Sequence, residues 1–67
     1  MKYPDIVAMA RLEATESGEP QIVYEYRPKS KSEYAYGTQD EFERTLGLGK
    51  FPVIRLLKCM PDGTVVQ

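Results

Sequence analysis

The stretch from Ile22 to Gly37, IVYEYRPKSKSEYAYG, constrains the fold more than any other part of the chain. Its two ends are rich in β-branched and aromatic residues, and its middle holds turn-forming residues without an apolar side chain. This pattern is typical of a β-hairpin. With Ser30 at the tip, one register sets aromatic opposite aromatic and cation opposite anion, so we expect that register. Its pairs are Tyr24 with Tyr36, Tyr26 with Tyr34, and Arg27 with Glu33.

This register places four tyrosines on one face of the hairpin, because every second residue of a strand points to the same side. They are Tyr24, Tyr26, Tyr34 and Tyr36, and Ile22 joins them. The chain has no tryptophan and only two phenylalanines, so a small sheet needs such rings for its core. We expect most of these rings to be core, and those nearest the tip to be the most exposed.

The charge pattern argues against a strong electrostatic role. The chain has 67 residues and a formal net charge of −1, from nine basic and ten acidic residues. Both signs are spread over the whole chain, whereas a domain that coats nucleic acid carries a large excess of cations. A chain of this length forms one small domain with a thin margin of stability.

Residues 5–16 carry two competing patterns. Their composition is rich in strong helix formers, Asp5 is placed to cap a helix, and Gly18 and Pro20 are placed to end one. Apolar residues also alternate through this segment, as in a half-buried strand. We expect the helix and keep the strand as the alternative.

The second half repeats this order of elements. Thr38 and Glu41 have the spacing of a capping box, which predicts a short helix that ends at Gly47. Residues 51–60 are predicted as a strand, and the sequence of residues 61–64, PDGT, as a tight turn that leads to a last strand. A two-residue turn at this place pairs Met60 with Val65 and Cys59 with Val66.

These elements predict an α+β fold with the order αββαββ: a small antiparallel sheet of four strands with both helices on one face. The alternative is βββαββ, with five strands and one helix. The chain is one domain over residues 1–67, and the similar order of elements suggests a duplicated αββ unit, 1–37 and 38–67.

The residue inventory provides little for catalysis. Histidine is absent and Cys59 is the only cysteine, so the commonest metal ligand and the usual general base are missing. An apolar strand raises the pKa of a thiol, and we interpret Cys59 as core. We expect no enzyme, no metal and no cofactor, and a protein of the reducing cytoplasm without a membrane segment.

The leading functional hypothesis is binding to a larger protein, because tyrosine and arginine are common in interface hot spots. The predicted contact residues cluster near the hairpin tip: Tyr26, Arg27, Lys29, Lys31 and Tyr34. One alternative is a binder of single-stranded nucleic acid that uses the same rings and cations. A second is a homodimer or larger homo-oligomer through the edge strand Thr64–Gln67. By analogy of size, a short accessory or inhibitory protein of a bacterium or phage is expected.

Overall fold

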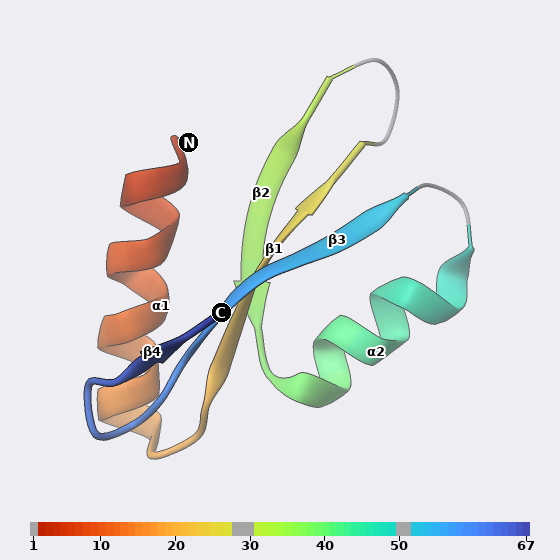
Figure 1. Cartoon of the computed structure of the whole chain (residues 1–67). Helices are drawn as coiled ribbons and strands as arrows, with labels where there is room; N and C mark the ends of the chain where they lie inside the picture. Colours follow the sequence, from red (N-terminus) through yellow and green to blue (C-terminus); the bar gives the residue numbers. More distant parts are fainter. Residues whose placement is uncertain (1, 28–30, 50–51) are drawn as a thin grey trace.

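The computed structural model describes residues 2–27, 31–49 and 52–67 (Figure 1). Two helices and four strands follow one another as α1 (Tyr3–Ser17), β1 (Gln21–Tyr26), β2 (Glu33–Gly37), α2 (Gln39–Leu48), β3 (Val53–Cys59) and β4 (Val65–Val66). The strands form one antiparallel sheet with the order β2-β1-β3-β4. The predicted α+β class and the order αββαββ are therefore confirmed, and the alternative with a strand at residues 5–16 is wrong.

Helix α1 starts earlier than its capping signal predicts. Pro4 lies in its first turn, where a missing N–H costs nothing, and Lys2 is the N-cap residue. Asp5 therefore lies inside the first turn and does not cap the helix. At the other end Gly18 adopts φ +74° and its N–H donates to Ala14 O at 3.0 Å. A left-handed glycine is the common end of a helix, so the predicted stop is confirmed.

Helix α2 begins at the predicted capping box. The Glu41 N–H donates to Thr38 Oγ1 at 3.3 Å, and the Thr38 N–H donates to Glu41 Oε1 at 3.2 Å. Two backbone donors that have no partner in the helix are thereby satisfied. The predicted end at Gly47 is wrong, because the helix continues to Leu48 and ends at Gly49, which has φ +63°.

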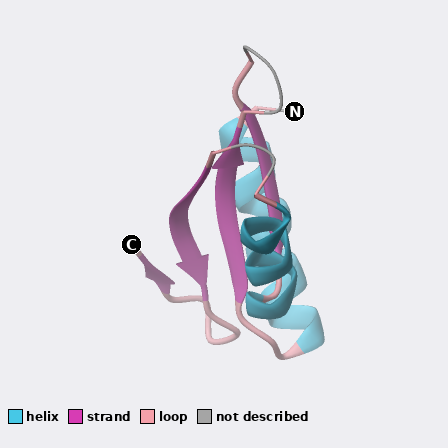
Figure 2. Cartoon of the chain, turned by 90° about the vertical axis from the view of Figure 1, so that its right-hand side faces the viewer, coloured by secondary structure: helices cyan, strands magenta, loops and turns pink. Residues whose placement is uncertain are grey.

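The two helices cover opposite faces of the sheet, so their predicted placement on one face is wrong. Val23 of β1 packs in one cluster with the buried residues of α1, whereas its neighbours Ile22 and Tyr24 pack with Phe42 of α2. Successive residues of a strand point to opposite faces. The sheet accordingly lies between α1 and α2 (Figure 1), and α2 stands in front of it and α1 behind it in Figure 2.

The first hairpin adopts a register one residue away from the predicted one. Val23 lies opposite Tyr36, Tyr24 opposite Ala35, Glu25 opposite Tyr34 and Tyr26 opposite Glu33. A shift of one residue moves the side chains of one strand to the other face. Tyr24 and Tyr26 therefore lie on the α2 face, and Tyr34 and Tyr36 lie on the α1 face. The predicted cluster of four tyrosines is wrong, because each face needs apolar cover for its own helix.

The second hairpin differs from its prediction by one residue as well. Cys59 lies opposite Val65, and Lys58 lies opposite Val66. The Met60 N–H donates to Thr64 O at 2.8 Å and closes a three-residue loop, whose last residue Gly63 has φ +91°. A type I turn followed by a left-handed glycine is a common three-residue hairpin loop. The predicted two-residue turn is therefore wrong, although the turn lies where it was expected.

Cys59 is 1 % exposed in the cluster under α1, so its prediction as a core residue is confirmed. Burial raises the pKa of its thiol, and the nearby charge of Arg11 opposes this only in part. The folded protein therefore resists ionisation of this thiol more than the unfolded chain does.

Contact between α1 and the sheet depends on small side chains. Ala10 and Ala14 are fully buried, and with Ile6 they form the stripe of α1 that faces the sheet. We expect Ala10→Leu to lower the free energy of unfolding by about 1 to 3 kcal/mol, because extra methylenes in a packed core force neighbours out of place. Urea unfolding followed by circular dichroism measures this. The control Ala8→Leu adds the same atoms at an exposed position of the same helix, and equal losses in the two variants would contradict the packing.

The Cys59 thiol also predicts a dependence of stability on pH. Because its pKa is raised in the folded state, the free energy of unfolding should fall as the pH rises above about 8.5, the ordinary pKa of a thiol. The Cys59→Ala variant should lose this contribution. We expect its stability, measured by urea unfolding between about pH 7.5 and 9.5, to fall less steeply than that of the natural protein. Parallel curves would show that the thiol does not contribute.

Candidate functional site

The structure does not bring the predicted contact residues onto one surface. Tyr26 and Tyr34 are both half-buried, but they lie on the α2 and α1 faces of the hairpin respectively. Arg27 and Lys31 are exposed at the tip end of the hairpin. Lys29 lies outside the described residues. Any partner that binds here meets one tyrosine or the other, but not both on one face.

Tyr26 is engaged with its own sheet. Its hydroxyl donates to Glu33 Oε2 at 3.1 Å across the hairpin, and its ring centroid lies 6.2 Å from that of Tyr24. Burial raises the pKa of Tyr26, and the hydrogen bond and the negative charge of Glu33 raise it further. These contacts hold the ring against the α2 face and leave it a poor candidate for a contact residue.

Tyr34 lies in a different setting, at the edge of an open pocket. Its ring centroid is 5.3 Å from that of Tyr3, which comes from the first turn of α1, and the two ring planes are tilted by 58°. Glu25 and Leu56 complete the walls of this pocket, which has a volume of about 350 Å³. We call it the tyrosine pocket. Lys31 lies beside it, since Lys31 and Tyr34 line a neighbouring hollow.

Ile54 extends the apolar surface beyond the tyrosine pocket. It is 51 % exposed, and it lies opposite Glu25 in the pairing of β1 with β3. A β-bulge between the Val23–Leu57 and Tyr24–Arg55 pairs inserts Leu56 as an extra residue, and Leu56 packs on the α1-side cluster. At the tip end of the α1 face, two tyrosine rings and the half-buried Leu56 thus line the pocket with Glu25, and the exposed Ile54 lies next to Glu25 on the same face.

Only part of this surface was predictable from the sequence. Tyr34 was among the predicted contact residues, whereas Tyr3, Ile54 and Leu56 were not. Ile54 and Leu56 belong to an apolar strand, and an apolar strand by itself predicts burial. Their exposure depends on where the neighbouring strand stops and on where α1 begins to cover the sheet, and neither can be read from a local pattern.

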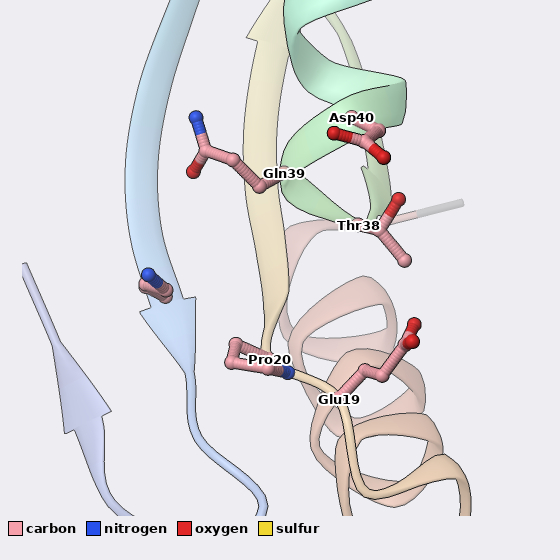
Figure 3. A pocket seen from close by; sticks show the side chains of 6 residues that line it. Glu19, Pro20, Thr38, Gln39 and Asp40 are labelled. Atoms are coloured by element: carbon pink, nitrogen blue, oxygen red, sulfur yellow. The ribbon is translucent and has the colours of Figure 1, made fainter.

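A second hollow, of about 260 Å³, lies at the opposite end of the sheet (Figure 3). Glu19 and Pro20 directly precede β1, Thr38 and Asp40 come from the start of α2, and Lys58 comes from β3. The side chains of Glu19, Thr38 and Asp40 lie along one side of it (Figure 3). Its charges are of both signs, and the capping box already occupies the Thr38 hydroxyl and the Glu41 N–H. The carboxylates of Glu19 and Asp40 in its lining oppose the binding of an anion there.

Other classes of site lack support in the described part of the chain. Across residues 2–27, 31–49 and 52–67, no three acidic or cysteine side chains are grouped so that they could hold a metal ion. Neither described helix is long and apolar enough to cross a membrane. The chain matches no protein-family model, no curated protein and no solved structure. Function is therefore inferred from the surface of the molecule alone.

The contact between Tyr26 and Glu33 can be tested by titration. We expect Glu33→Ala to lower the pKa of Tyr26, because the substitution removes both the hydrogen bond and the charge that disfavour the phenolate. The absorbance of tyrosinate during an alkaline titration, with Tyr26→Phe variants to isolate this ring, measures the shift. Glu25→Ala is the matched control, since Glu25 lies opposite Tyr34. An equal shift of the Tyr26 pKa in both variants would contradict the assignment.

Proposed function

We propose that this chain is a small non-enzymatic protein-binding domain, and that its contact surface is the tyrosine pocket together with Ile54. The observation that carries the proposal is the position of Ile54, an aliphatic side chain with half of its surface exposed on the face of the sheet that holds a pocket lined by two tyrosine rings and Leu56. Single exposed apolar residues are ordinary on a protein surface. A group of them around a pocket is typical of a surface that another molecule covers.

The composition of this surface favours a protein as the partner. Tyrosine is enriched where interfaces gain most of their binding energy, and an aliphatic neighbour adds area that is removed from water on binding. Glu25 lines the pocket and Lys31 lies beside Tyr34, so the apolar centre has charged neighbours of both signs. An apolar centre with a polar rim is the usual anatomy of a protein interface.

The nucleic-acid alternative loses the arrangement on which it depended. Stacking of successive bases requires several rings on one face beside cations. The observed register separates the tyrosines into two pairs on opposite faces. We therefore keep protein binding as the proposal. The accessory or inhibitory role and the bacterial or phage origin rest on chain length alone and stay predictions.

Site-specific crosslinking tests the proposed surface. A photoreactive benzoyl-phenylalanine replaces Ile54 in the full chain, which is expressed in the organism that encodes it. We expect a covalent adduct with a larger protein that survives nuclease treatment. The matched control carries the same group at Leu12, which is 60 % exposed on α1. Tyr34→Ala in the Ile54 variant should reduce the adduct, and Tyr34→Phe, which keeps the ring, should preserve it.

Several outcomes would overturn the proposal. The absence of an adduct at Ile54, or the same adducts at Leu12, would show that this surface is not a specific contact. An adduct that nuclease removes would indicate nucleic acid. An adduct of twice the mass of the chain would indicate self-association, and circular dichroism of each variant shows whether the fold is kept.

A further inference from the structure

The outer edge of β3 is open over most of its length. β4 pairs only with Lys58 and Cys59. Among the described residues, no strand pairs with residues 53–57 on the side away from β1. Figure 2 shows this part of β3 at the margin of the sheet, above the short β4. A strand edge of this kind presents backbone N–H and C=O groups that another strand can use.

The side chains on the two faces of this edge differ in polarity and charge. Ile54 and Leu56 lie on the α1 face, where Leu56 lines the tyrosine pocket and Ile54 lies opposite Glu25, another residue of its lining. Arg55 lies on the other face, opposite Tyr24, and it is exposed. Its guanidinium forms no ion pair or hydrogen bond with another described residue. Lys58 shares this face, because it lies opposite Ile22. The open part of the edge is therefore apolar on the α1 side and carries one cation, Arg55, beside Val53 on the other.

We propose that this edge binds an extended segment of a protein partner as an additional β-strand. The segment carries an acidic side chain that meets Arg55 and, at the alternate positions, apolar side chains that meet Ile54 and Leu56 on the other face. Backbone hydrogen bonds supply affinity in strand addition, and alternate side chains supply specificity. The inference rests on the proposed function, and it names the chemistry of the partner and the way in which it binds.

A second copy of the chain suits this edge poorly. The register that pairs all of residues 53–57 with the same residues of another copy in antiparallel sense sets Arg55 opposite Arg55. Like charges directly opposite each other destabilise a strand pair. A segment with an acidic residue at that position gains an opposite-charge pair instead. Arg55 thus disfavours self-pairing and favours an acidic partner, which is how specificity commonly arises.

Three features of β3 are of the kind that protects edge strands against unwanted pairing. Pro52 precedes the strand, a bulge interrupts it, and Arg55 carries a charge. They do not cover residues 53–57, and the bulge places Leu56 on the same side as the tyrosine pocket. On the opposite side, Arg55 is the charged residue of the open part of β3, since Lys58 lies where β4 pairs. These features therefore disfavour pairing with a second copy of the chain and still allow an acidic strand to bind.

Peptide binding to the full chain tests the proposal. The probe is a short capped peptide with a fluorescent label in which Val alternates with Glu, and its counterpart carries Lys in place of Glu. We expect saturable binding of the Glu peptide in fluorescence anisotropy, about tenfold tighter than that of the Lys peptide. A Glu peptide with alternate backbone nitrogens methylated keeps its side chains but cannot complete the strand ladder, and it should lose binding.

Charge reversal provides the matched variants. Arg55→Glu should invert the preference between the two peptides, whereas Arg44→Glu makes the same charge change at an exposed position of α2, outside the proposed surface, and should leave the preference unchanged. Equal binding of the methylated peptide would overturn strand addition. An unchanged preference in Arg55→Glu, with the fold intact by circular dichroism, would overturn the role of Arg55. No binding of the Glu peptide by the natural protein would overturn the whole inference.

Failure of this inference is distinguishable from failure of the proposed function. If the peptides do not bind but the Ile54 crosslink captures a larger protein, the surface is correct and the partner does not add a strand. If the Glu peptide binds and the crosslink captures nothing in the cell, the edge accepts strands but the proposed cellular role is wrong.

Discussion

The structure depends on a central strand that is buried from both sides. Ile22 and Val23 are adjacent in β1 and both are fully buried, yet they point in opposite directions. Val23 meets the alanine stripe of α1, and Ile22 belongs to the cluster with Phe42 of α2. Each helix therefore has a separate small core, and β1 is the element that the two cores share.

Local signals in the sequence predicted the elements well. The capping box at Thr38, the left-handed Gly18 and the turn before Thr64 all lie where their residue types place them. These features depend on contacts between residues a few positions apart, and the chemistry of each is specific. The α+β class and the order of the six elements follow from them.

Properties that depend on distant contacts were not predictable in the same way. The hairpin register was inferred from cross-strand pairs of tyrosines, which contribute only about 0.2 to 1 kcal/mol each. In the observed register Tyr34 and Tyr36 pack under α1 and Ala35 under α2, and burial of these side chains outweighs such pairs. Most of the candidate surface was not predictable from the sequence for the same reason. Tyr34 was identified because of its residue type, but the roles of Ile54 and Tyr3 depend on the end of β4 and the start of α1.

The buried side chains of β1 alternate between the two faces of the sheet, and the helices that cover these faces determine how the hairpin is paired. The cross-strand pairs within the segment favour the predicted alignment, whereas the observed alignment gives each helix apolar side chains of the hairpin to cover. The hairpin therefore owes its pairing to parts of the chain that lie outside it.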